Sequence, residues 1–246
     1  MDVHLLEVAS GVFHVRAQHV GWVMITEGNE VTLVDTGYPG DRERLIRSLR
    51  RIGRRPSDVV AVLLTHAHPD QLGSAEYLRS TEETRVLVHP DEVDHATGRC
   101  IEQVGTPRVL LRAWRPSVAL WARDVIGLKA EKVERLTSVD TFDCEPLDVP
   151  GRPRPVHTPG HTSGHCVFHL ADRAALLAGD ALMTAHAVSR SSGPQLMPRF
   201  FNVDSDRARE SLRSIAELEA HVVVPGHGPA FRGSPAIAVR TALGQR

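Results

Sequence analysis

The sequence has only three cysteines, no long apolar run and almost no net charge, and each of these absences excludes a class of protein. Cys100, Cys144 and Cys166 lie far apart, which excludes a disulfide scaffold and a cysteine-based zinc site. No apolar run approaches the ~20 residues that a membrane span requires. The first residues do not combine a basic segment with a long apolar one, so we expect no signal peptide, a cytoplasmic protein and no membrane partner.

The 29 basic and 30 acidic residues nearly cancel, giving a formal net charge of −1 at pH 7. Such a balance does not attract the whole molecule to a polyanion, so we expect no nucleic-acid partner. We expect a small-molecule substrate instead. The sequence does not determine the oligomeric state.

Histidine is the residue type in excess, with 14 copies, and several of them follow predicted strands. Residues 59–64 form a nearly continuous apolar run, which predicts a strand buried on both faces. That strand leads directly into the sequence THAHPDQ at 65–71. In an extended chain, residues i, i+2 and i+4 point the same way, so His66, His68 and Asp70 would be presented together. Two imidazoles and a carboxylate form a ligand set that suits Zn²⁺.

Three later loops also place histidine or aspartate just after or beside a predicted strand. They supply His157, His161, His165, Asp180 and His227. Glycines in these loops allow sharp turns and close approach of the backbone. The sequence therefore predicts that several loops contribute to one metal site.

Apolar periodicity alternates between strand-like and helix-like segments, which predicts one α/β or mixed layered domain. Strands are predicted at 12–17, 22–26, 31–34, 59–64, 86–88, 155–158, 165–170, 174–178 and 222–224. Helices are predicted at 41–51, at 72–78 and from 204 or 205 to 219.

Residues 91–132 differ from the segments on either side, because their apolar residues recur at helical spacing. The series includes Val109, Leu110, Ala113, Val118 and Trp121. We interpret this part as a helical insertion. Two roles are open for it: packing against the domain, or a lid over the functional site.

Together these segments resemble the metallo-β-lactamase superfamily, whose pattern is H-x-H-x-D-H followed by a distant His, Asp and His. The match runs in order from LVDTG at 33–37 to PGHG at 225–228, over nearly the whole chain. The resemblance implies an α/β fold, a four-layered αββα sandwich with a dinuclear metal site along one edge of the sheets. It implies a single domain over 1–246, with the insertion at about 91–132.

Transferred residue by residue, the resemblance implies six metal ligands. His66, His68 and His161 would hold the first metal, Asp70 and His227 would hold the second, and Asp180 would bridge the two. The implied cofactor is zinc, as one or two ions, with iron and manganese as alternatives.

One position departs from the family pattern, because Gln71 stands where the motif has its last histidine, a ligand of the second metal. An amide oxygen is a neutral and weaker donor than imidazole for Zn²⁺. Two hypotheses follow from this departure. Either the second site is weakened and empty at low metal concentration, or Gln71 ligates through its oxygen and both sites are filled.

Four further residues would support the site without binding metal. We expect Asp35 to brace the metal-binding loops through hydrogen bonds. His157 and His165 are assigned structural roles around the ligands. His186 could line the pocket.

The ligand set predicts hydrolysis. A metal ion with an open coordination position lowers the pKa of bound water from ~15.7 to about 7, which supplies hydroxide for attack on a carbonyl carbon. We expect Asp70 to be the catalytic residue that orients this water or accepts its proton.

The loop at 157–165, HTPGHTSGH, is similar to that of glyoxalase II-like thioesterases and of lactonases. The resemblance therefore implies a small-molecule ester, thioester or lactone as substrate. Three alternatives stay open: a mononuclear-iron oxidoreductase like the persulfide dioxygenases, a β-lactamase, and a non-catalytic metal-binding relative.

Overall fold

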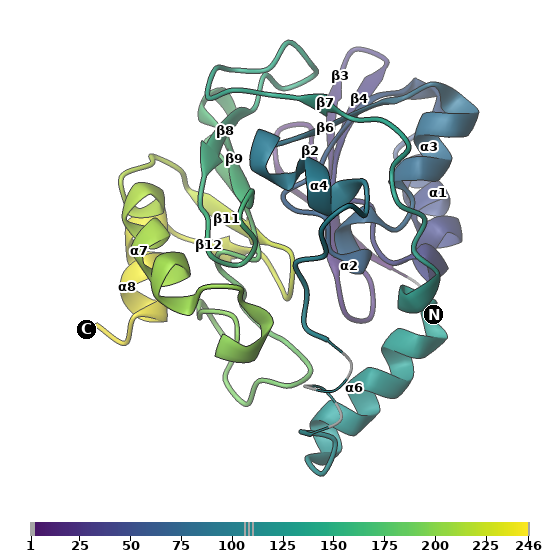
Figure 1. The fold of residues 1–246 in the computed structure, drawn as a ribbon. Helices are drawn as coiled ribbons and strands as arrows, with labels where there is room; N and C mark the ends of the chain where they lie inside the picture. The colour runs from purple at the N-terminus through teal and green to yellow at the C-terminus, as the bar shows by residue number, and fades with distance from the viewer. Residues whose placement is uncertain (1–2, 106, 108, 110, 246) are drawn as a thin grey trace.

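The computed structural model describes residues 3–105, 107, 109 and 111–245. Within these residues two β-sheets pack face to face, with helices on the outer face of each (Figure 1). The N-terminal sheet comprises β1 His4–Ala9, β2 Val12–Arg16, β3 Gly21–Glu27, β4 Glu30–Val34, β5 Val59–Leu63, β6 Arg85–Val88 and β7 Asp140–Thr141, in that spatial order. The C-terminal sheet comprises β8 Arg154–His157, β9 Cys166–Leu170, β10 Ala175–Gly179, β11 Val222–Pro225 and β12 Phe231–Arg232, in the order β12-β11-β10-β9-β8.

Two parallel strand pairs bring the functional loops together. In the N-terminal sheet β4 runs parallel to β5, and in the C-terminal sheet β10 runs parallel to β11. Parallel neighbours end at the same edge of a sheet. Asp35 and His66 follow β4 and β5 closely, while Asp180 and His227 follow β10 and β11 in the same way.

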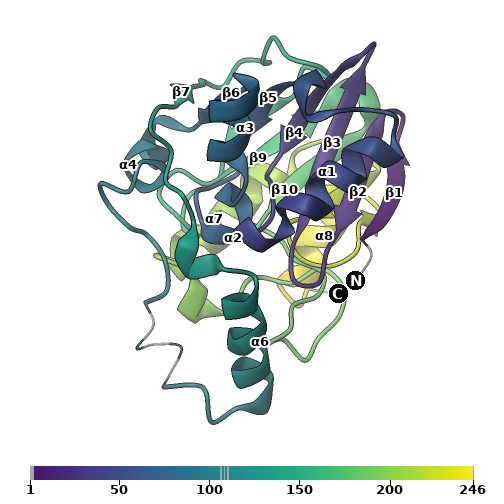
Figure 2. The same ribbon diagram turned by 90° about the vertical axis from the view of Figure 1, so that its right-hand side faces the viewer.

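The helices lie outside the sheets, and Figure 2 shows two of them, α1 and α3, across the N-terminal sheet. Their bounds are α1 Arg42–Arg51, α2 Pro69–Leu72, α3 Ala75–Glu82, α4 Val93–Ala96, α6 Pro116–Gly127, α7 Ser205–Ala216 and α8 Pro235–Ala242. Among the described residues, no helix combines the length and the apolar character needed to cross a membrane.

Three apolar layers hold the sandwich together. The middle layer lies between the sheets and includes Ile25, Leu63, Phe168, Leu177 and Val224. One outer layer joins the N-terminal sheet to its helices and includes Trp22, Leu33, Leu45, Leu49 and Leu78. The other joins the C-terminal sheet to α7 and α8 and includes Leu176, Leu212, Ile215, Val223 and Val239. The αββα sandwich expected from the sequence is therefore confirmed.

The helix predicted at 72–78 is wrong in its bounds, because the structure divides this region into α2 and α3 at Gly73. A Cβ atom on Gly73 would lie 2.3 Å from the carbonyl oxygen of Gly37 and 2.3 Å from the carbonyl carbon of Tyr38. The Gly73 N–H also donates to the Gly37 carbonyl oxygen at 3.0 Å. This backbone contact, which apolar periodicity does not reveal, ends one helix and fixes it against the loop after β4.

The insertion at 91–132 is only partly helical. It contains α4 and α6, and residues 97–105 between them form turns, bends and irregular chain. Leu110, on which the helical prediction partly rested, lies outside the described residues. α6 projects from the body of the molecule in both views (Figures 1 and 2) and buries Val118 and Trp121 on one side.

The close approach at Gly73 leads to a test of stability. We expect Gly73→Ala to lower the free energy of unfolding by about 1–3 kcal/mol, because the added methyl group overlaps the backbone after β4. The control is Gly127→Ala at the end of α6, where an added Cβ meets nothing within 4 Å. This control should be neutral or stabilising by up to about 1 kcal/mol. Equal urea midpoints for the two variants would contradict the explanation.

Candidate metal centre

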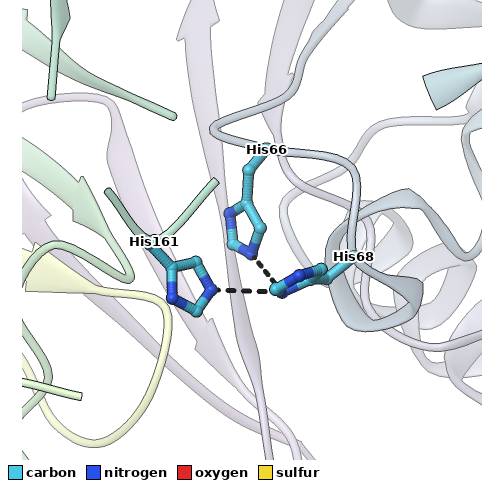
Figure 3. Close-up of side chains that lie close together, drawn as sticks. All are labelled: His66, His68 and His161. Atoms are coloured by element: carbon cyan, nitrogen blue, oxygen red, sulfur yellow. Dashed lines mark hydrogen bonds between the residues drawn. The ribbon is translucent and has the colours of Figure 1, made fainter. Parts of the chain in front are cut away.

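Three buried histidine rings converge where loops from the two sheets meet. His66 follows β5, His68 immediately precedes α2, and His161 lies in the loop between β8 and β9. His68 Nδ1 lies 3.1 Å from His66 Nε2 and 3.1 Å from His161 Nε2 (Figure 3). All three side chains are buried. Nitrogens about 2.0–2.1 Å from one tetrahedral zinc ion would be separated by roughly 3.3–3.4 Å, so this spacing fits a shared ion.

The outer nitrogens of these rings are held by hydrogen bonds, which fixes the role of the inner ones. His68 Nε2 donates to the Glu102 carbonyl oxygen at 2.7 Å. His161 Nδ1 donates to the Asn202 side-chain oxygen at 2.9 Å. A neutral imidazole that donates through one nitrogen carries a lone pair on the other. The inner nitrogens of His68 and His161 therefore face each other as lone pairs, an arrangement that a cation stabilises.

A chain of hydrogen bonds through Thr65 orients His66. The Thr65 hydroxyl lies 2.9 Å from Asp35 Oδ2 and 3.0 Å from His66 Nδ1. Asp35 also accepts the Thr65 N–H at 2.9 Å. Burial raises the pKa of Asp35 to about 8, although the bonds from Thr65 act in the opposite direction. Asp35 adopts φ of 61°, a costly conformation for a non-glycine residue and one that clusters at functional sites.

A second group of ligand atoms lies beside the first. His227 Nε2 is 3.3 Å from Asp70 Oδ2 and 3.2 Å from Asp180 Oδ2. The same oxygen of Asp180 lies 3.3 Å from His161 Nε2. Asp180 Oδ2 therefore stands between the two groups. The extended-chain prediction for Asp70 is wrong, because Asp70 lies in α2 and faces His227 instead of joining His66 and His68.

Several buried polar atoms of this second group have no hydrogen-bond partner. Within the described part of the chain these are Asp180 Oδ1 and His227 Nε2, and both side-chain polar atoms of Gln71, the residue after Asp70, are likewise unpaired. An unsatisfied buried polar atom costs about 1–3 kcal/mol. His227 Nε2 is close to two carboxylates without making a well-directed hydrogen bond to either, as expected for ligands that surround a common ion. The donor set and the orphaned atoms therefore fit a divalent metal.

The protonation states agree with this assignment. Burial and the neighbouring rings lower the pKa of His66 and of His68 well below the usual range, so both are neutral donors at pH 7. Burial alone would also lower the pKa of His227, but Asp180 and Asp70 raise it well above the usual value. Burial alone would raise the pKa of Asp180, whereas His227 and His161 lower it overall. The second group thus has an excess of negative charge that a cation can balance.

His165 lies beside the ligands and contacts the backbone of one of them. Its Nε2 accepts the Asp180 N–H at 3.1 Å, and its Nδ1 lies 2.8 Å from the Thr158 hydroxyl. Burial lowers the pKa of His165 to about 3, so the ring is neutral and can accept this bond. The ring thereby holds the start of the loop that carries Asp180.

His157 lies apart from the six ligands and stacks on His89, with ring centroids 3.9 Å apart and planes 14° apart. With Asp91 these rings form a third cluster of possible ligand atoms. However, His89 Nδ1 already accepts the Asp91 N–H. The two rings are also nearly parallel, so the nitrogen lone pairs, which lie in the ring planes, do not point at a common metal position. This cluster does not form a metal site in the present arrangement.

His186 and His19 adjoin the second ligand group. The centroid of the His186 ring lies 4.9 Å from that of His227. His186 also contacts Phe201, and it contacts Trp121, which belongs to α6. Burial lowers the pKa of His186 to about 3. The carbonyl oxygen of His19 accepts the Nδ1–H of His227 at 2.6 Å. His19 thus orients a ligand through its backbone.

Sequence analysis missed Glu92, a buried acid that connects the two ligand loops. Its Oε1 accepts from the Ala67 N–H at 2.8 Å and its Oε2 from the Gly164 N–H at 3.0 Å. The Thr162 hydroxyl donates to Oε2 at 2.7 Å, and His95 Nδ1 lies 2.9 Å from Oε1. Glu92 lies four residues after the end of β6. The pattern that indicated the ligands, a histidine or acid soon after a strand, could therefore have indicated Glu92 as well.

Sequence analysis also missed Asn202, which orients His161. No local motif marks Asn202, because it lies 41 positions from His161 in the sequence. It directly follows the short turn at Arg199–Phe201.

Glu92 gives rise to a pH-dependent prediction. Burial alone would raise its pKa, but the bonds from His95, Thr162 and Ala67 lower it from 4.5 to about 2. We expect Glu92→Gln to reduce the free energy of unfolding of the metal-free protein by about 3 kcal/mol at pH 7. The depressed pKa stabilises the fold fully above pH 4.5, and this contribution is lost as the pH falls toward 2.

Denaturant titrations of both proteins between pH 7 and pH 3 would measure this effect, and the difference between them should shrink on acidification. Glu210→Gln is the control, since Glu210 is an exposed acid paired with Arg213, and it should change stability by less than about 0.5 kcal/mol. A pH-independent difference for Glu92→Gln would show that lost packing, and not lost charge, explains the change.

Known proteins resemble this arrangement in sequence and in fold. A model of the metallo-beta-lactamase superfamily matches residues 16–227. The probable metallo-hydrolase YflN of Bacillus subtilis (strain 168) is 26% identical over 242 residues, covering 92% of this chain and 87% of YflN.

Among solved structures, the metallo-beta-lactamase family protein TTHA1429 from Thermus thermophilus has a TM-score of 0.67 at 25% identity, covering 98% of this chain and 78% of that one. A Cronobacter sakazakii metallo-beta-lactamase with an HARLDQ motif has a TM-score of 0.64 at 17% identity, covering 92% and 81%, and this likeness shows the fold alone. Since the family model spans most of the sequence, the chain belongs to the metallo-β-lactamase superfamily.

Proposed function

We propose that this chain is a cytoplasmic, zinc-dependent hydrolase that acts on a small-molecule ester, thioester or lactone. The position of Asp180 Oδ2 carries the proposal, since this oxygen lies 3.3 Å from His161 Nε2 in one ligand group and 3.2 Å from His227 Nε2 in the other. A carboxylate shared by two ligand groups suits a pair of divalent ions. Paired metal ions are a recurrent device of hydrolytic enzymes.

When bound, the metal supplies an activated nucleophile and polarises the substrate carbonyl. The inner nitrogens of His66, His68 and His161 would hold one ion, Asp70 and His227 would hold the other, and Asp180 would contact both. The ligand side chains are buried between the sheets. Burial lowers the effective dielectric constant, so these groups interact strongly with charge that develops on the substrate oxygen.

Asp70 is the residue to which we assign orientation of the nucleophile. Its side chain is 12% exposed, compared with 2% for Asp180, so Asp70 is the more accessible of the two carboxylates. Oδ2 of Asp70 faces His227, which leaves Oδ1 to accept a hydrogen bond or a proton from the attacking group.

An uncharged aromatic cluster packs beside the second ligand group. Phe201 packs edge to face on both Trp121 and His186, and the His186 ring packs edge to face on that of His227. His186 carries no charge at neutral pH, because burial lowers its pKa to about 3. The ester, thioester or lactone class is proposed from the similarity of the loop at 157–165 to that of glyoxalase II-like thioesterases and lactonases. The name of YflN, a probable metallo-hydrolase, agrees with this class of reaction.

Gln71 distinguishes the two metal positions in this proposal. Its amide is fully buried beside Asp70, and neither polar atom has a hydrogen-bond partner. This supports a role as a weak oxygen ligand of the second ion. The Cronobacter protein carries the motif HARLDQ, which ends in the same Asp-Gln pair as HAHPDQ at 66–71.

Substituting Gln71 tests this difference between the sites. We expect the wild-type protein to retain close to one ion per chain after dialysis and Gln71→His to retain close to two, because imidazole binds zinc more strongly than an amide oxygen. Elemental analysis for zinc, iron and manganese would measure both number and identity. Gln245→His, at an exposed position near the C-terminus, is the control for an added histidine. Two tightly held ions in the wild-type protein would refute the weakened second site.

Substituting Asp70 tests the catalytic assignment. We expect Asp70→Asn to reduce turnover of a thioester, ester or lactone substrate about 10²–10⁴-fold, since the amide can no longer accept a proton. Metal content and melting temperature should be recorded for the same sample, so that lost metal is separated from lost chemistry. Asp172→Asn, on the exposed turn after β9, is the control. Wild-type turnover in a metal-replete Asp70→Asn protein would exclude the assigned role.

A further inference from the structure

Residues 111–129, which include α6, form a projecting segment with an unusual surface. Eight large apolar side chains are exposed among the described residues, and four of these belong to this short segment. They are Leu111, Trp114, Leu120 and Ile126, each more than half exposed. Scattered exposed apolar residues are ordinary, but a concentration of them on one protruding element marks an interaction surface.

The projecting segment is also basic. It contains Arg112, Arg115, Arg123 and Lys129 but only one acid, Asp124, which gives a formal net charge of +3. Because the whole chain carries −1, the remainder carries −4. Asp124 is itself bonded to Gln18, His19 and Arg123. The outward surface of the segment is therefore positive on an otherwise acidic molecule.

Contacts on one side hold the segment to the body. Val118 and Trp121 belong to an apolar cluster with Val188 and Phe201. Asp124 accepts from Gln18 at 2.9 Å and lies 3.2 Å from His19 Nε2. The packing that buries these residues leaves the four apolar side chains exposed, together with Arg123 and Lys129, while Arg112 and Arg115 are partly exposed. Figures 1 and 2 show α6 standing away from both sheets, so a large flat partner could approach it.

We propose that the projecting segment docks on the surface of an anionic lipid bilayer. Helices with Trp and Leu beside Lys and Arg lie in the bilayer interface, where the apolar side chains enter the acyl boundary and the cations meet anionic headgroups. Tryptophan favours this interface because its ring is apolar and its N–H is polar. α6 has 12 residues, about 18 Å of helix, so it lies on a bilayer and does not cross one. This revises the expectation of no membrane partner.

The charge argues against a second copy of this chain as the occupant. A symmetric dimer through this surface would place one +3 segment against another, and like charges facing each other at an interface are unfavourable. A lipid surface of opposite charge gains from the same residues. The proposal concerns binding alone and does not depend on the proposed function.

Trp114 provides a native reporter for the test. It is 80% exposed, whereas Trp22 and Trp121 are buried. We expect vesicles of equal parts phosphatidylglycerol and phosphatidylcholine to shift the tryptophan emission of the full chain to shorter wavelength and to protect it from iodide. Vesicles of phosphatidylcholine alone should bind far more weakly. Binding should weaken as salt is raised from about 0.05 to about 0.5 M, because the Debye length falls.

Variants separate the apolar and ionic contributions, with binding measured by co-sedimentation. Leu111→Ser combined with Trp114→Ser should abolish sedimentation with the anionic vesicles. Arg115→Gln combined with Lys129→Gln should weaken binding about fivefold for each charge removed. The control combines Leu6→Ser and Ile237→Ser, which remove two apolar side chains of 44% exposure outside the segment, and it should bind like wild type.

Three results would overturn the proposal. The first is no binding of the wild-type chain to anionic vesicles at low salt. The second is a lack of specificity: either the wild-type chain binds anionic and neutral vesicles equally, or the control variant loses as much binding as Leu111→Ser combined with Trp114→Ser. The third is a concentration-dependent dimer in sedimentation velocity that disappears with Leu111→Ser and Trp114→Ser while no vesicle binding is seen, which would identify a second copy as the occupant.

Discussion

The buried carboxylate of Asp180 lies within 3.3 Å of imidazole nitrogens from two separate loops, His161 and His227. Two buried carboxylates, Asp70 and Asp180, face the single imidazole of His227, whose pKa they raise well above its usual value. This leaves a net negative charge among the buried side chains, and burying unbalanced charge is costly. The surrounding structure nevertheless holds the groups in place, by bonds to the outer ring nitrogens and to the backbone of the loops. Hydrogen bonds from the protein thus fix the orientation of the side chains that would hold a metal.

The sandwich architecture makes this arrangement feasible. Two parallel strand pairs, one in each sheet, deliver Asp35 with His66 and Asp180 with His227 to the same edge. Glu92 then joins the loops of the first ligand group, since it accepts bonds from the backbone of Ala67 and of Gly164. Rigid strands fix where the loops begin, and buried hydrogen bonds fix where their side chains point.

The insertion connects the metal centre with the molecular surface. On its inner side α6 contacts His186 through Trp121 and is tied through Asp124 to His19, whose carbonyl oxygen orients His227. The outer side of α6 exposes Leu120 and Ile126, and the segment 111–129 that contains it carries a formal net charge of +3. One short element thus packs beside the residues that adjoin and orient His227 while its other side is exposed to solvent; the lid role considered for the insertion stays a prediction.

The sequence by itself determined the fold class and the ligand types, because strands that end in histidine or aspartate leave a strong local pattern. It missed β1 and the two-residue strands β7 and β12, which depend on pairing more than on periodicity. The family resemblance assigned Asp70 to a different metal from His66 and His68, and the tertiary structure gives the physical reason, because Asp70 lies in α2 and faces His227. The tertiary structure also decided the supporting roles of Glu92 and Asn202, because hydrogen bonds between residues far apart in the chain leave no local signature.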